Sequence, residues 1–292
     1  MQALERKPPQ PVPPVHALPE YLVSGQRARW YAEMKHVFQV PWMGVVTMAF
    51  SYYPRFFDAL WRGLKPIAQS RPFVEACSAL RSHTEARVVE LQPEPIVRRL
   101  QTWGYARREI EQIRASIEVF SHGNFPYLLT ATAARRLLEG LDLGHSTDAP
   151  VHVGHHAPQV DIPFVLMEVH HADQDTRALY QDIKASLGLP FVNTDYRALA
   201  RWPSYFALAW NDLKPVVNTD VYAAICTDIH EWADRLVVEN LPNPADLTAD
   251  SLRSAADDDG DLDEIVQVVR LFQWLLPGLV TNIAFFRAQL DD

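Results

Sequence analysis

The feature that most constrains the fold of this chain is an internal duplication. The 36 residues that begin at Tyr31 align without a gap on the 36 residues that begin at Tyr180, and ten of these positions are identical. The offset is 149 residues throughout. A weaker match, at an offset of 151 residues, joins the segments that begin at Pro126 and Pro277. The chain is therefore expected to consist of two structural repeats of the same kind.

The hydrophobic pattern of both halves is helical. Apolar residues recur every three or four positions, and few segments alternate as strands do. Prolines such as Pro41 and Pro54 stand where a first helical turn or a corner between helices tolerates the missing N–H. The pattern predicts helices over 73–89, 110–120, 127–141, 222–238 and 265–290. We therefore expect an all-α fold, a pseudo-dimer of two duplicated helical halves.

Four segments follow from the repeat boundaries. Residues 1–25 are rich in proline and are expected to form an arm without regular helix, lying on the surface or on a partner subunit. Residues 26–141 form the first helical repeat and residues 175–292 the second. Between them, residues 142–174 are rich in Pro, Gly, His and Asp, a composition typical of a linker.

Charge and composition exclude several classes of partner. A net charge of -9 without any basic run argues against nucleic-acid binding. The apolar stretches are too short or too interrupted to span a bilayer, and the start of the chain does not resemble a secretory signal, so we expect a cytoplasmic protein. Cys77 and Cys226 occupy equivalent repeat positions, which predicts two buried thiols rather than a metal or redox pair.

No metal site is predicted from the chain. The histidines that invite one fall in the Pro/Gly linker rather than on paired helix faces: His152, His155, His156, His170 and His171. The acidic run 257–261 resembles a calcium loop, but the register places Ala255 and Val266 at the first and last ligand positions. This run is interpreted as a solvated helix start.

Positions where the two repeats differ are candidates for a single shared active site. Asp195 corresponds to Val46, and Asn124 corresponds approximately to Leu275. A position that is aliphatic in one copy accepts burial, and a buried carboxylate needs partners or a task. Two structural alternatives stay open: Asp195 lies in the first turn of a helix capped by Asn193 or Thr194 and favours the helix dipole, and Asn124 marks a turn.

An aromatic pair follows the paired prolines in the two repeats. Trp42 corresponds to Phe191. Core packing explains Phe191. Trp42 also carries an indole N–H, which can donate to a halide or line an apolar pocket.

At these residues the chain resembles the group I 2-haloacid dehalogenases. The resemblance rests on YAEMKHVFQVPW, HGNFPYLL and NTDYRALARWP, in this order, and on the two-half organisation. It implies an all-helical pseudo-dimer with one active site between the halves, no metal, no organic cofactor and a homodimer. Asp195 would deprotonate water and Asn124 would help to hold that water. The remaining residues would line the substrate pocket: Trp42, Val45, Asn193, Thr194, Tyr127 and Phe272.

The expected reaction is hydrolysis of a short 2-haloacid to a 2-hydroxyacid. A water activated by Asp195 would attack directly, invert the reacting carbon and leave no ester on the enzyme. Asn193 beside the base would crowd one wall of the pocket and favour D enantiomers. The alternatives are an enzyme that accepts both enantiomers and a noncatalytic helical protein that binds a small acid.

Overall fold

The computed structural model describes residues 3–160 and 162–291. Throughout these residues the regular elements are helices, and the one β-bridge joins Ser70 and Val151. Contacts divide the chain into two compact units. Unit 1 comprises Met1–Arg81, Gly123–Ala157 and Thr227–Gly278, and unit 2 comprises Ser82–His122, Pro158–Cys226 and Leu279–Asp292. Each unit thus combines segments that are far apart in the sequence.

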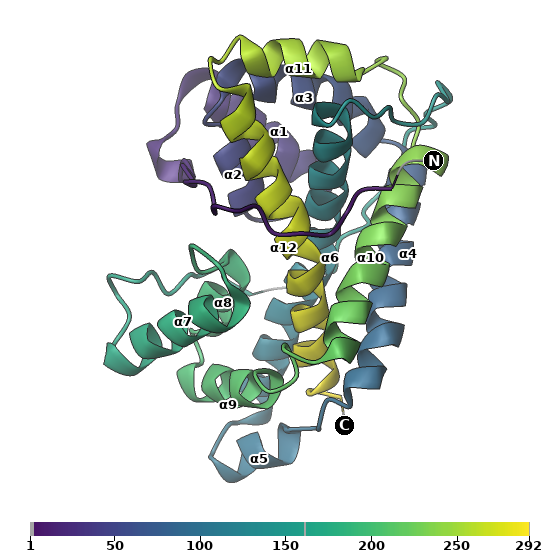
Figure 1. Cartoon of the computed structure of the whole chain (residues 1–292). Coiled ribbons are helices and arrows are strands. Elements are labelled where there is room, and N and C mark those ends of the chain that lie inside the picture. The colour runs from purple at the N-terminus through teal and green to yellow at the C-terminus, as the bar shows by residue number, and fades with distance from the viewer. Residues whose placement is uncertain (1–2, 161, 292) are drawn as a thin grey trace. The chain divides into compact units, whose positions relative to one another are not determined.

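Unit 1 is built around three helices from the start of the chain. Helix α3 contacts α1, α2 and α11, and the four lie together in Figure 1. Their apolar faces form a core that includes the fully buried rings of Phe38, Phe50 and Phe57. The helices of this unit are α1 (Gly25–Phe38), α2 (Val45–Phe50), α3 (Pro54–Ala68) and α11 (Ala249–Asp257).

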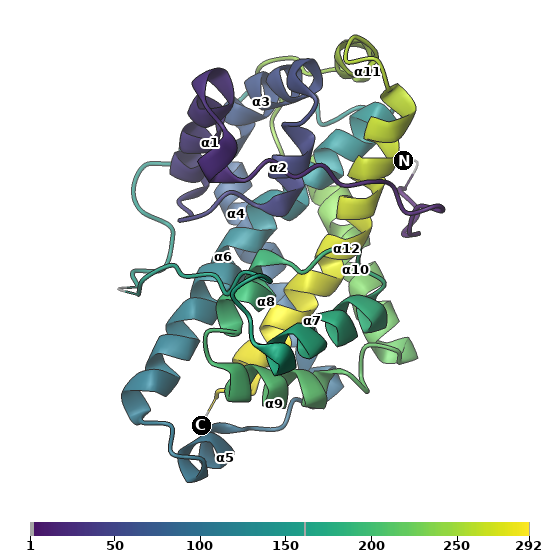
Figure 2. The same ribbon diagram turned by 90° about the vertical axis from the view of Figure 1, so that its left-hand side faces the viewer.

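Unit 2, like unit 1, contains four of the shorter helices. Helix α8 contacts α9, and Phe206 of α9 lies 6.2 Å from Phe286 of α12, so these helices pack beside the end of α12, as Figure 2 shows. The short helices of this unit are α5 (Val97–Thr102), α7 (Gln174–Leu187), α8 (Thr194–Leu199) and α9 (Pro203–Leu213). Four longer helices contribute residues to both units: α4 (Arg71–Val88), α6 (Arg107–Leu138), α10 (Asp220–Glu239) and α12 (Leu262–Ala288).

Helix bounds and hydrogen bonds recur at the offset of the sequence repeat. Helices α1, α2 and α3 begin 149 residues before α7, α8 and α9, respectively. The Tyr31 hydroxyl donates to the carbonyl of Leu18, and the Tyr180 hydroxyl donates to the carbonyl of Met167, again 149 residues later. These shared residues therefore hold equivalent local structure within each unit.

A single helix occupies the region near the middle of the chain where two helices were expected. The pattern predicted helices over 110–120 and 127–141, whereas α6 runs unbroken from Arg107 to Leu138 through Pro126. The interpretation of Asn124 as a turn residue is therefore wrong. Pro126 removes one backbone donor, but buried side chains on both sides of it, such as Phe120 and Leu129, keep the helix packed.

The proline-rich arm lies on unit 1. Among the described residues of this arm that precede α1, 3–24, regular structure is limited to one short 3-10 helix, η1 (Glu20–Leu22). Near its start, Leu4 is buried, its N–H donates to Asp234 and its carbonyl contacts a ring nitrogen of His230. Since Asp234 also pairs with Arg136 of α6, the arm completes a buried polar network.

The expectation that every apolar stretch is too short or too interrupted to span a bilayer is wrong for helix α12, which is long and apolar enough to cross a membrane by length and composition alone. However, 83% of its most apolar 18-residue window is buried inside the fold. Such burial is typical of the core helix of a globular protein.

Candidate active site

The predicted site residues fall into two groups. Unit 1 carries Trp42, Val45, Asn124, Tyr127 and Phe272, and unit 2 carries Asn193, Thr194 and Asp195. All of them except Val45, which is half-buried, are buried.

In unit 1, Trp42 packs against the HGNFPY motif of α6. A Cβ added to Gly123 would collide with the indole ring of Trp42 and would lie 2.7 Å from Cγ1 of Val40. Only glycine therefore lets the indole approach the backbone of α6 so closely. The next residue is Asn124, whose side chain is 3% exposed. Hence the structure brings Trp42 to the turn of α6 that carries Asn124.

Tyr127, one turn further along α6, holds the same segment. Its hydroxyl donates to the carbonyl of Trp42 at 2.8 Å, and its ring lies 6.0 Å from the Trp42 ring. A Cβ on Gly44 would meet the Tyr127 ring at 2.9 Å. The phenol therefore fixes the backbone between Trp42 and α2, where Val45 is the first helical residue.

A second contact to this backbone, not predicted from the sequence, comes from Glu20. The N–H of Met43 donates to the Glu20 carboxylate at 2.9 Å, and Glu20 also pairs with Lys35 of α1. The peptide group between Trp42 and Met43 is thus held at its carbonyl by α6 and at its N–H by the arm. Glu20 corresponds to Val169 at the repeat offset, and this polar-for-aliphatic difference is the signal that could have revealed it.

Phe272 of α12 reaches the other end of α2. Its ring, 1% exposed, lies 5.8 Å from that of Phe50 in an edge-to-face arrangement. Such aromatic pairs have a defined geometry. The position of Phe272 is consequently coupled to the helix that begins at Val45.

In unit 2, Asp195 lies in the first turn of α8 and is 2% exposed. Its repeat counterpart Val46 is 4% exposed, which confirms the prediction that this position is buried. Asn193 occupies the N-cap position, but its side chain makes no capping hydrogen bond. The capping alternative therefore does not account for Asn193.

The two residues before the base differ in their hydrogen bonding. Within the described part of the chain, Oδ1 of the buried Asn193 has no hydrogen-bond partner. An unpaired buried acceptor costs about 1–3 kcal/mol. The Thr194 hydroxyl accepts from Arg197, whose guanidinium also pairs with both oxygens of Glu168. Arg197 is a further residue that was not predicted from the sequence, and its repeat counterpart is Met48.

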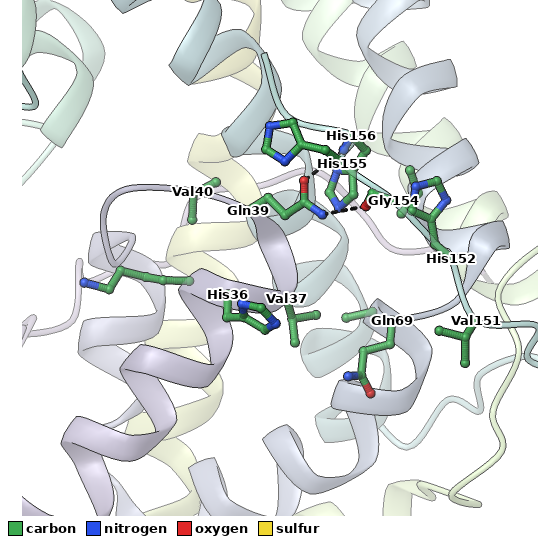
Figure 3. Close-up of a pocket in the computed structure, with 13 residues that line it drawn as sticks. His36, Val37, Gln39, Val40, Gln69, Val151, His152, Gly154, His155 and His156 are labelled. Carbon is green, nitrogen blue, oxygen red and sulfur yellow. Dashed lines mark hydrogen bonds between the residues drawn. The ribbon is translucent and has the colours of Figure 1, made fainter. Parts of the chain in front are cut away.

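Three of the five linker histidines that invite a metal site gather elsewhere in unit 1, whereas His170 and His171 belong to unit 2. A surface pocket of about 560 Å³ is lined by His36, His152, His155 and His156 together with the amide of Gln39, as Figure 3 shows. That amide holds the loop, because its oxygen accepts from the N–H of His156 and its nitrogen donates to the carbonyl of Gly154. Across residues 3–160 and 162–291, no three His, Cys, Asp or Glu side chains are grouped so that they could hold a metal ion.

The known proteins similar to this chain that are described next are all named as 2-haloacid dehalogenases. An (R)-2-haloacid dehalogenase of Rhizobium sp. is 50% identical over 85% of this chain and 96% of its own length. An (R)-2-haloacid dehalogenase of Pseudomonas putida is 38% identical over 94% of this chain and 92% of its own length. A solved D-2-haloacid dehalogenase, in complex with L-LA, is 36% identical and superposes with a TM-score of 0.88 over 99% of this chain and 100% of its own. No family model matches the sequence. The identity and coverage of these relatives show that the chain belongs to the (R)-2-haloacid dehalogenase family.

Proposed function

We propose that this enzyme hydrolyses short D-2-haloalkanoic acids to L-2-hydroxyacids. The observation that carries the proposal is Asp195. A carboxylate is buried at the start of α8, where the other repeat buries a valine, in a chain of this family. Because the fold accommodates an apolar residue at the equivalent position, packing alone does not require the acid.

Asp195 acts as the general base. It takes a proton from a water molecule while the water oxygen forms a bond to C2 and the carbon-halogen bond breaks. The halide leaves with the bonding electron pair, and attack from behind inverts C2. General-base assistance of this kind is typically worth about 10²- to 10⁴-fold in rate. Asn124 orients the water through its amide, so that positioning contributes a further share.

The remaining residues bind the substrate. Trp42, Val45, Tyr127 and Phe272 supply an apolar surface for the carbon chain and the halogen, with the Trp42 indole N–H toward the halide. Thr194 offers its hydroxyl to the substrate carboxylate.

Asn193 accounts for the enantiomer preference. Its buried oxygen accepts hydrogen bonds, so a donor such as water stabilises this wall and a methyl group does not. A cost of about 1–3 kcal/mol corresponds to roughly 5- to 150-fold discrimination.

The proposal is tested by halide release from D- and L-2-chloropropanoate, with chiral analysis of the lactate formed. We expect the D enantiomer to react faster and to yield L-lactate. Asp195→Asn should fold normally and lose nearly all turnover, since the amide matches the carboxylate in size but takes no proton. Asn124→Ala should also reduce turnover. Halide release by Asp195→Asn at the wild-type rate would rule out this base.

Three outcomes separate the alternatives. Single turnover in H₂¹⁸O should label the product hydroxyl and leave the protein unlabelled, whereas label in Asp195 would indicate an ester intermediate. Equal rates on both enantiomers would identify an enzyme without stereopreference. Binding of the acid without halide release would identify a noncatalytic small-acid-binding protein.

A further inference from the structure

A buried chain of polar side chains ends next to the proposed base. The Tyr222 hydroxyl of α10 donates to Oδ1 of Asn282 at 2.8 Å, and Nδ2 of Asn282 donates to the Tyr196 hydroxyl at 2.9 Å. Asn282 belongs to α12, and Tyr196 directly follows Asp195 in α8. All three residues belong to unit 2, and they are 7%, 1% and 0% exposed in the order Tyr222, Asn282, Tyr196. These hydrogen bonds therefore link α8, the helix that carries the base, to the longer helices α10 and α12.

The first repeat builds the equivalent core without this network. At the offset of 149 residues, Tyr222 corresponds to Phe73 and Tyr196 to Thr47, and at the offset of 151 residues Asn282 corresponds to Ala131. Phe73, Thr47 and Ala131 are themselves buried. The fold thus packs these positions without the polar chain, and general stability does not explain why unit 2 has one.

Helix α8 needs anchors from the rest of the unit. It has six residues, which is too short to be stable by its own backbone hydrogen bonds. Tyr196 is anchored twice, because its ring stacks on Phe206 at 5.9 Å while its hydroxyl accepts from Asn282. Burial raises the pKa of the Tyr196 hydroxyl, the hydrogen bond from Asn282 partly offsets this rise, and the Asp195 carboxylate adds to it. The hydroxyl therefore stays neutral beside the base.

We infer that Asn282 and Tyr222 are positioning residues for catalysis, acting through Tyr196 to hold α8 so that Asp195 is aligned with its water. This inference rests on the proposed function. The amide of Asn282 restrains the Tyr196 hydroxyl along one direction, and Tyr222 restrains the amide in turn. Since a displacement of about 1 Å can cost about 100-fold in rate, loosening this chain should lower kcat and leave substrate binding largely intact.

The decisive variant makes the whole network apolar. Tyr196→Phe, Tyr222→Phe and Asn282→Leu are combined, which leaves no member of the chain with an unpaired buried group. We expect this triple variant to fold with a melting temperature within a few degrees of the wild type. Its kcat should fall by about 10- to 100-fold, with KM changed by less than about twofold. A folded triple variant with wild-type kcat would overturn the inference.

A single variant and a control complete the experiment. Tyr222→Phe removes only the hydroxyl farthest from the base and should give an intermediate loss of kcat. An unchanged kcat would count against the positioning role of Tyr222. Tyr180→Phe removes a hydroxyl of the same unit whose hydrogen bond recurs in the other repeat, and it should leave kcat unchanged.

Backbone hydrogen exchange of residues 194–199 gives a readout that does not depend on turnover. Exchange in this segment should be faster in the triple variant, and unchanged exchange would refute the positioning role. Absence of halide release by the wild-type enzyme would refute the proposed function instead, so the two failures are distinguishable.

Discussion

Acidification should destabilise this protein through one buried histidine, His230 of α10. The ring is fully buried, with Nε2 2.7 Å from the Leu4 carbonyl and Nδ1 2.8 Å from the side-chain nitrogen of Gln273. One ring nitrogen thus donates and the other accepts, as a neutral imidazole does. The pKa of His230 is lowered from 6.5 to about 4, chiefly by burial. The charges of Arg135 and Arg6 contribute to this lowering, and the hydrogen bond to Leu4 partly opposes it.

The sign and size of the effect follow from these two pKa values. The unfolded chain takes up a proton at His230 near pH 6.5 and the folded protein only near pH 4, so the stability contributed by the neutral ring is lost as the pH falls through this window. Between pH 7 and pH 5 the difference amounts to about 2 kcal/mol of unfolding free energy. The contribution is fully present above pH 7.

The assay is urea unfolding at pH 7 and pH 5 of the wild type and His230→Gln. The variant should be less stable at pH 7, because Gln reproduces the imidazole contacts incompletely, but its loss between the two pH values should be smaller by about 2 kcal/mol. His36→Gln, at an exposed histidine, should keep the wild-type loss. Equal losses in the wild type and His230→Gln would refute the reasoning.

Two further predictions concern the segment that carries Trp42. Gly123→Ala should lower the melting temperature and raise KM, because the added methyl group collides with the Trp42 ring and overpacking costs about 1–3 kcal/mol. Helix propensity alone would favour Ala by about 1 kcal/mol, so a stabilised variant would contradict the contact. Glu20→Ala should raise KM about fivefold, the change that corresponds to about 1 kcal/mol, since it leaves the N–H of the buried Met43 without its acceptor. Steady-state kinetics should show no such rise for Glu5→Ala, whose carboxylate lies on the same arm and pairs with Lys7.

The sequence by itself determined the all-helical class, the duplicated segments and the family. These are recorded in local patterns, because apolar spacing depends on a few neighbouring residues and a duplication preserves it at a constant offset. The buried state of Asp195 was also predictable, since its counterpart Val46 showed what the position accepts. The assignment of Asp195 and Asn124 to catalysis stays a prediction of the family resemblance.

Only the tertiary structure decided how these positions are held. Pro126 predicts a break by local rules, yet burial on both sides of it keeps α6 continuous. The hydrogen bond from Met43 to Glu20 spans 23 residues, and that from Asn282 to Tyr196 spans 86. No local periodicity encodes such pairs. They form because the packing of apolar faces brings distant segments together, and buried polar groups must then find partners within reach.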